Sequence, residues 1–310
     1  MAALAAVYVI WGSTYLAMRI AVEGLPPFLM ASTRFLVTGT VLLAFLRLRG
    51  APWPTRREWL WSAPVGFLMF VLGNGTVAYA EEHISSGVAA VVCGTMPLWA
   101  AALGPLFGER ATSREWVGMV LGFAGVAALG LGKELRADPG ATAVLVLAPV
   151  SWALGSLIAR KKPLPKGLMS AATQMLTGGA LMAVVSAGWG EKVPALATVP
   201  VRSLLALLYL AVFGSLVAYS AYTYLLRATR PAVATSYSYV NPALAVLVGV
   251  LLGGEHAGPE VFLSVALIIA ATVMVVLGRT RSLPRLEPAP RSAGSALPEK
   301  DAEAAETPAR

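Results

Sequence analysis

Long apolar runs separated by short polar connections dominate the chain as far as about residue 280. A bilayer with a hydrocarbon core about 30 Å thick is crossed by a helix of about 20 apolar residues. The runs that approach this length are 2–20, 28–46, 59–80, 86–107, 115–132, 142–159, 169–188, 201–226, 232–253 and 259–278. The pattern therefore predicts an all-α polytopic membrane protein with ten transmembrane helices.

The composition favours the same class of protein. Apolar residues make up 57% of the chain and charged residues only 13%, whereas about a quarter of an ordinary soluble domain is charged. This composition excludes a soluble enzyme. The single Cys excludes a disulfide framework and a Cys-based zinc site, and two His leave little for metal binding. We therefore expect neither a metal nor a cofactor.

The basic residues predict the orientation of the chain. They give a net charge of +8 and occur in short clusters between apolar runs, which favours a membrane over nucleic acid as the partner. If the N-terminus is cytoplasmic, the cytoplasmic side receives 18 of the 24 Lys and Arg residues and the outer side receives five. Cytoplasmic loops are rich in Lys and Arg, so we expect both termini to be cytoplasmic. No basic segment precedes the first run, so we do not expect a cleavable signal peptide.

The two halves of the chain resemble each other at an offset of 140 to 145 residues. The matching pairs are Trp11 and Trp152, Arg19 and Arg160, Thr33 and Thr173, Gly39 and Gly179, Tyr79 and Tyr224, Pro97 and Pro242, and Glu115 and Glu260. Five spans per half is an odd number, so the second copy is expected to lie upside down, as in transporters built from inverted repeats. The alternative is a duplication retained only for packing.

This pattern predicts three parts of the chain. A first five-helix repeat covers residues 1–135 and a second, inverted one covers 141–280. Residues 281–310 are rich in Pro, Ala, Ser and Glu and lack apolar periodicity, so we expect a disordered cytoplasmic tail.

Several short motifs resemble a known family. They are Trp-Gly-Ser-Thr-Tyr at 11–15, Pro-Leu-Trp at 97–99, Phe-Gly-Glu-Arg at 107–110, Ser-Trp-Ala-Leu-Gly-Ser at 151–156 and Ser-Tyr-Ser-Tyr-Val-Asn-Pro at 236–242. Together they are similar to EamA-type transporters of the drug/metabolite transporter superfamily, in the YedA-like branch of bacterial inner-membrane exporters. The resemblance implies a 5+5 inverted repeat and export of small metabolites or drugs. It does not supply the substrate.

Two prolines are candidates for shaping a cavity. Pro97 and Pro242 hold equivalent positions in the fourth and ninth spans. Proline removes a backbone donor, which frees the carbonyl of Cys93 or Ser238 and kinks the helix. Paired kinks in inverted repeats favour helices that line a cavity, although they could also serve packing alone.

Polar residues inside the spans are candidates for binding a substrate. Tyr237, Ser238 and Asn241 share one face of the ninth span. Asn74 lies between two glycines in the third span and could equally join two helices.

Aromatic residues inside the spans are a second set of candidates. They are Trp11, Trp99, Trp152, Tyr79, Tyr219 and Tyr222. Aromatic rings can stack on planar substrates or attract cationic ones. Ordinary core packing is the alternative for each residue.

The remaining candidates are charged or titratable. Arg34 lies inside the second span, where it could snorkel outward, pair with Glu81 or Glu82, or face a cavity and attract a carboxylate. Glu82 and His83 follow the third span and could couple transport to protons, although such clusters often serve only as solvated loops.

We therefore expect a secondary transporter of the bacterial inner membrane that exports a small metabolite, amino-acid-like compound or drug by alternating access. An importer or exchanger on the same fold remains open. A membrane-embedded enzyme would need a nucleophile–base pair or metal ligands at bilayer depth, and a scaffold would not need matched prolines. No phosphate-binding loop motif is present, which disfavours ATP-driven transport by this chain alone. The expected partners are a small-molecule substrate and the lipid bilayer but no nucleic acid, and a homodimer is compatible with the sequence.

Overall fold

The computed structural model describes residues 2–108, 112–129, 139–228 and 237–282, and within these ranges every regular element is a helix. The segments long and apolar enough to cross a membrane number seven in this part of the chain. They are Ala2–Val22, Pro27–Leu48, Arg56–Ala80, Ser86–Phe107, Ala143–Lys161, Leu168–Trp189 and Val201–Tyr222. The predicted all-α membrane protein is confirmed to this extent.

The first half of the chain contributes a series of long and broken helices. They are α1 (Ala2–Val22), α2 (Pro27–Leu48), α3 (Arg56–Gly66), η1 (Phe67–Gly75), α4 (Thr76–Ala80), α5 (Ser86–Cys93), α6 (Met96–Leu103), η2 (Gly104–Phe107) and α7 (Ser113–Leu129). The helix α7 overlaps the fifth predicted span, 115–132, and begins two residues before it. The predicted tail lies largely outside the described residues.

The second half continues in the same manner. Its helices are α9 (Pro139–Lys161), α10 (Leu168–Trp189), η3 (Leu196–Thr198), α11 (Val201–Tyr209), η4 (Leu210–Val217), α12 (Ala218–Ala228), α14 (Tyr237–Gly253) and α15 (Pro259–Ser282). The shorter apolar stretches Val240–Gly253 and Pro259–Met274 fall within the ninth and tenth predicted spans. The arrangement of ten spans as two repeats stays a prediction.

Two π-helical segments interrupt the third and eighth predicted spans at corresponding places. The segment η1 separates α3 from α4, and η4 separates α11 from α12. Their first residues, Phe67 and Leu210, are 143 positions apart, within the offset that relates the two halves. Such segments are rare in proteins and are often found at functional sites.

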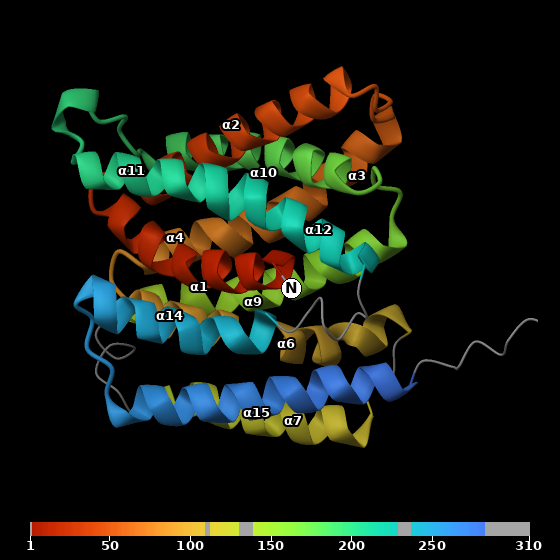
Figure 1. The fold of residues 1–310 in the computed structure, drawn as a ribbon, viewed down its shortest axis with the longest axis vertical. Coiled ribbons are helices and arrows are strands. Elements are labelled where there is room, and N and C mark those ends of the chain that lie inside the picture. Colours follow the sequence, from red (N-terminus) through yellow and green to blue (C-terminus); the bar gives the residue numbers. More distant parts are fainter. Residues whose placement is uncertain (1, 109–111, 130–138, 229–236, 283–310) are drawn as a thin grey trace, which may run out of the picture.

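Helices at corresponding positions of the two halves pack along each other. Figure 1 shows α2 beside α10, and α7 beside α15, which agrees with their extensive contacts. Between these pairs, α1 contacts α14, α11 and α12, while η1 and α4 contact α9. The main buried apolar cluster joins residues of α1, α4, α5, α9 and α14. The helices therefore surround a centre built from both halves.

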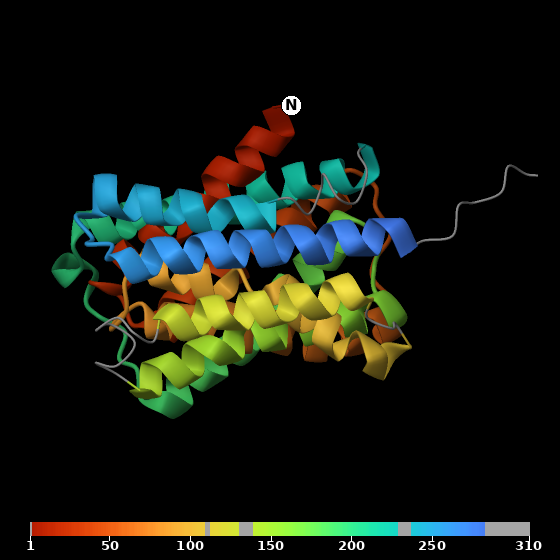
Figure 2. The same cartoon turned by 90° about the horizontal axis from the view of Figure 1, so that it is seen from below.

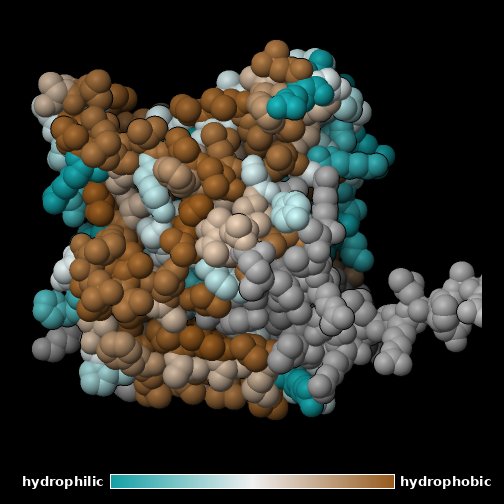
Figure 3. All heavy atoms as spheres, viewed as in Figure 1, coloured by the Kyte–Doolittle hydropathy of each residue, from teal (hydrophilic) through white to brown (hydrophobic). Residues whose placement is uncertain are grey.

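The connections between helices lie at two opposite ends of the molecule. Residues 23–26, 81–85, 190–200 and 254–258 lie together at the left of Figure 1, and Figure 2 shows the same grouping. We call this the Glu255 end. Hydrophobic residues cover much of the coloured surface in Figure 3. Exposed apolar side chains among the described residues include Val37, Val120 and Leu208. Such a surface suits contact with lipid.

A carboxylate from the second half of the chain caps the N-terminus of a helix in the first half. The side chain of Glu191 accepts hydrogen bonds from the main-chain N–H groups of Phe28 at 3.0 Å and Leu29 at 2.7 Å. These donors have no partner within their own helix because they lie in its first turn. The N-terminus of α2 is therefore tied to the C-terminus of α10 at the Glu255 end.

Candidate functional site

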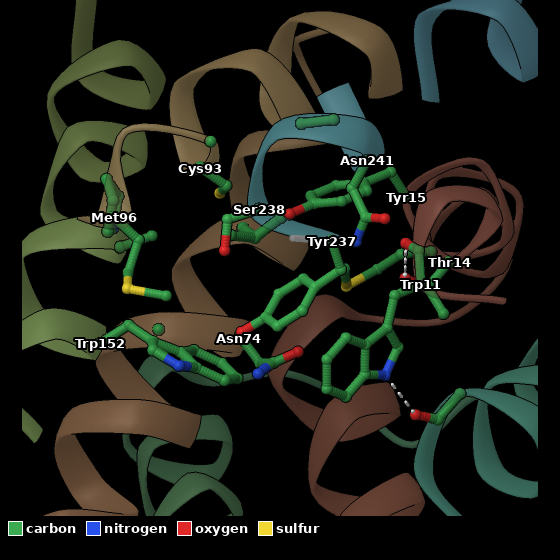
Figure 4. Close-up of a pocket in the computed structure, with 18 of the residues that line it drawn as sticks. Trp11, Thr14, Tyr15, Asn74, Cys93, Met96, Trp152, Tyr237, Ser238 and Asn241 are labelled. Atoms are coloured by element: carbon green, nitrogen blue, oxygen red, sulfur yellow. Dashed lines mark hydrogen bonds between the residues drawn. The ribbon is translucent and has the colours of Figure 1, made fainter. Parts of the chain in front are cut away.

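A central pocket of about 150 Å³ lies where the two halves meet. A void of about this size accommodates a ring such as benzene. Its walls include these predicted candidates: Trp11, Arg34, Asn74, Trp152, Tyr237, Ser238, Asn241 and Pro242. In Figure 4 the rings of Trp11 and Trp152 lie on either side of Asn74 and Tyr237. The sequence pattern thus located much of the lining.

Trp11 joins α1 to the π-helical segment η4. Its indole Nε1 donates a hydrogen bond of 3.1 Å to the main-chain carbonyl of Gly214. The ring also packs against three tyrosines, with centroid distances of 5.5 Å to Tyr219, 5.2 Å to Tyr222 and 4.7 Å to Tyr237. These contacts hold the indole in one orientation at the pocket wall.

Trp152 on α9 meets η1 in the corresponding way. A Cβ atom added to Gly73 would lie 2.8 Å from Cε3 of Trp152, so only glycine permits this approach. Gly73 and Gly214 are 141 residues apart, as are Trp11 and Trp152. Each half therefore places a tryptophan against a glycine in the π-helical segment of the other half.

Arg34 is a buried cation that borders the pocket from α2. Its side chain is 5% exposed, and its Nε donates a hydrogen bond of 3.0 Å to Oγ of Ser215. The guanidinium carbon lies 4.8 Å from the ring centroid of Phe35. Within the described ranges Arg34 forms no ion pair, so it does not pair with Glu81 or Glu82 as one reading of the sequence allowed. A guanidinium in this setting can bind an anionic group of a ligand.

The pocket also offers a hydrogen-bond acceptor that is not used. Asn241 on α14 is 8% exposed, and its Oδ1 is buried without a hydrogen-bond partner. Buried polar atoms are seldom left in that state, and those that are can serve a ligand. Asn74 on η1 is only weakly engaged, because its Nδ2 lies 3.5 Å from the carbonyl of Met69. Both amides are therefore available to a polar solute.

The fourth predicted span is broken at the pocket. The helix α5 ends at Cys93, and α6 begins at Met96, one residue before Pro97. The ninth span differs, because α14 continues through Pro242. The two spans cross closely, since a Cβ atom on Gly94 would lie 2.6 Å from Cγ of Pro242.

Comparison with known proteins decides the family. The sequence profile of the EamA-like transporter family matches residues 1–131 and 140–277. The chain belongs to this family. The inner membrane transporter YedA of Escherichia coli (strain K12) is 44% identical over 278 residues, which cover 89% of this chain and 90% of YedA. This EamA protein is accordingly a membrane transporter of the drug/metabolite transporter superfamily.

More distant proteins agree with this assignment. The transporter YdfC of Bacillus subtilis (strain 168) is 26% identical over 249 residues, which cover 79% of this chain and 80% of YdfC. One protein of known crystal structure shares the fold with a TM-score of 0.59 and 21% identity, covering 91% of this chain and 98% of that protein.

Some predicted residues of the EamA transporter lie away from the pocket. Trp99 packs edge-on against Phe123 of α7, with ring centroids 4.9 Å apart. Tyr79 instead lines a second, shallower depression at the Glu255 end and stacks against Phe28. Tyr222 packs against Trp11, but neither Tyr222 nor Pro97 is part of the pocket wall. Whether any of these residues binds a substrate stays a prediction.

The proposed coupling residues are exposed. Glu82 and His83 both lie on the surface after α4, while the preceding Glu81 is completely buried. Tyr219, one of the aromatic candidates, also lines the pocket. Sequence reasoning did not select three other lining residues: Thr14, Tyr15 and Gly214. Tyr15 follows Trp11 by one turn of α1, so the helical period could have indicated it. Gly214 carried no such signal, because its position depends on η4.

Proposed function

We propose that this EamA transporter is a secondary exporter of the bacterial inner membrane that carries a small amphipathic solute through the central pocket by alternating access. The observation that carries the proposal is the pocket itself, with its matched contacts of Trp11 with Gly214 and Trp152 with Gly73. Substrate sites at the interface of inverted repeats are typical of such carriers. The two stretches matched by the family profile and the packing of α2 with α10 support a 5+5 inverted repeat.

The Glu255 end of the pocket is closed in this structure. The helices α5 and α14 pack tightly here, and a Cβ atom on Gly87 would lie 3.2 Å from Cγ2 of Val246. The carboxylate of Glu255 accepts hydrogen bonds from the main-chain N–H groups of Ser86 at 2.8 Å and Gly87 at 3.1 Å. Separation of α5 from α14 would open this end, which supports a cycle between two forms.

The chemistry of the pocket favours an amino-acid-like solute. Arg34 supplies a positive charge for a carboxylate, and Oδ1 of Asn241 supplies an acceptor for an N–H or O–H donor. Trp11 and Trp152 supply apolar faces for the body of the molecule. With this set, a carboxylate-bearing solute should bind better than its neutral ester.

Whole-cell efflux tests this function. Cells that express the transporter and cells with an empty vector are loaded with a panel of labelled amino acids, their methyl esters and organic cations, and loss of label is followed. We expect faster efflux of at least one class with the wild type. Trp11→Ala should abolish the difference, while Trp116→Ala, at a side chain that is 58% exposed on α7, should not. Net accumulation would show an importer, and no effect across the panel would contradict transport of this solute class.

A further inference from the structure

A carboxyl group lies fully buried just beyond the pocket. Glu81 directly follows α4, its side chain is 0% exposed, and both carboxylate oxygens lack a hydrogen-bond partner. Ionised carboxylates are almost never buried in this way, because nothing replaces the water that solvated them. A neutral carboxylic acid is compatible with such a site.

The surroundings of Glu81 contain one cation and a second carboxylate. On α1, Arg19 donates a hydrogen bond from Nη1 to the main-chain carbonyl of Glu81, and Tyr15 lies within electrostatic reach. Cys93 on α5 faces Glu81 as well, and Glu255 approaches from the segment after α14. The α9 residues of the adjoining cluster are apolar, namely Ala141, Leu145 and Ala148.

These surroundings favour the protonated form. Burial raises the pKa of the Glu81 carboxyl well above its usual range, the Glu255 carboxylate raises it further, and the Arg19 guanidinium opposes both effects. Arg19 does not neutralise the carboxylate directly, because its hydrogen bond goes to the main chain. Removal of water is therefore the main cause.

Glu81 lies between residues that line the pocket and residues of the closed end. Val77, one helical turn earlier and about 6 Å away along α4, lines the pocket, as do Tyr15 and Cys93. On the other side, Glu255 is the group that ties the end of α14 to the first turn of α5. A movement that opens this end would withdraw Glu255 and admit water to Glu81.

We propose that Glu81 is the proton-binding site of the transport cycle, and that it takes up one proton when the Glu255 end closes. The proposal rests on the transport function above and assigns the proton to Glu81 rather than to Glu82 or His83. In the open form water solvates the Glu81 carboxylate. On closure the carboxylate binds a proton from that side and becomes a neutral acid, and reopening releases the proton to the same side. This step makes closure depend on pH and carries no proton across the membrane. The closed form thus holds one more proton than the open form, so acidification favours closure.

Infrared difference spectroscopy on the purified full-length protein tests the protonation without a substrate. We expect the C=O stretch of a buried carboxylic acid at neutral pH in the wild type and in Glu82→Gln, and its loss in Glu81→Gln. In Glu255→Gln the band should titrate at lower pH, because the neighbouring negative charge is gone. The Glu255→Gln variant keeps the test valid if Glu81→Gln fails to fold. A band that persists in Glu81→Gln, or a midpoint that Glu255→Gln leaves unchanged, overturns the proposal.

Thiol labelling tests the link to closure. A single cysteine at Ala90, on the pocket-facing side of α5, is introduced in a Cys93→Ser background and modified with an impermeant reagent at the Glu255 end. Rates are divided by those of an exposed reference, Val193→Cys. With Glu81 present, the ratio should fall about tenfold per pH unit of acidification between the two pKa values of the open and closed forms. With Glu81→Gln it should not vary, and equal pH dependence in both proteins overturns the proposal. Neither measurement needs a transported compound. Failure of the proton-binding proposal can therefore be distinguished from failure of the proposed transport function, which the efflux assay tests.

Discussion

The indole Nε1 of Trp11 donates a hydrogen bond of 3.1 Å to the carbonyl of Gly214, which is 203 residues away in the chain. Trp152 meets Gly73 at the corresponding place in the other half, where a Cβ atom would lie 2.8 Å from its ring. Both glycines belong to π-helical segments. The pocket thus depends on two pairs of contacts between halves, and each pair can be altered by a single methyl group.

Gly214→Ala should impair transport by adding such a methyl group. Its Cβ would lie 2.9 Å from Cγ2 of Thr14 and 3.0 Å from Nη2 of Arg34, so one or both side chains must move. Excess volume in a packed core costs about 1–3 kcal/mol of folding stability, so we expect the pocket to rearrange and transport to slow. Gly188→Ala is the matched control, because nothing lies within 4 Å of the added atom. Equal transport by both variants in the efflux assay would show that η4 is not part of the transport site.

The orientation of the chain can be tested with two cysteines in a Cys93→Ser background. Val193 is 79% exposed at the Glu255 end, and Trp53 is 62% exposed between α2 and α3. The distribution of Lys and Arg places the first outside and the second in the cytoplasm. An impermeant thiol reagent should therefore label Val193→Cys in intact cells, and Trp53→Cys only after the cells are opened. The reverse labelling pattern would show that the transporter has the opposite orientation in the membrane.

The prolines of the fourth and ninth spans should matter for transport. Pro242→Ala removes the ring that packs against Gly94, and Pro97→Ala lets a helix continue across the break between α5 and α6. We expect each variant to lose about tenfold in efflux rate while reaching the membrane in normal amounts, because alanine is a good helix former. Pro64→Ala, at an exposed position inside α3, should retain transport. If all three variants transport equally, the prolines serve packing alone.

Hydropathy predicted where the helices lie because lipid leaves the backbone no partner except its own helix. The runs around 2–20 and 169–188, for example, agree closely with α1 and α10. The π-helical segments were not predictable in the same way. Their extra residue changes neither composition nor apolar length, so it left no signal in a pattern that records only which residues are apolar.

The sequence could not distinguish between neighbouring candidates at the pocket. Trp99 and Trp152 carry the same side chain at similar depth, but Trp99 packs on Phe123 while Trp152 reaches the pocket. Similarly, Glu81 and Glu82 are adjacent, and only the last turn of α4 decides which one is buried. Such differences depend on how the helices are rotated about their axes, which tertiary packing sets.

Transport of a carboxylate-bearing solute through the site of Arg34 is the central claim, and counterflow in liposomes tests it most directly. Purified protein is reconstituted in liposomes loaded with an unlabelled amino acid from the efflux panel, and uptake of the labelled form is compared with uptake of its methyl ester. Loss of a hydrogen-bonded charge contact costs about 2 kcal/mol, or roughly thirty-fold in affinity. We expect Arg34→Gln to lose about that much for the acid and little for the ester, while Arg202→Gln, in an exposed pair with Glu23, retains both. Equal loss of acid and ester by folded Arg34→Gln protein, or no loss of either, would contradict the account.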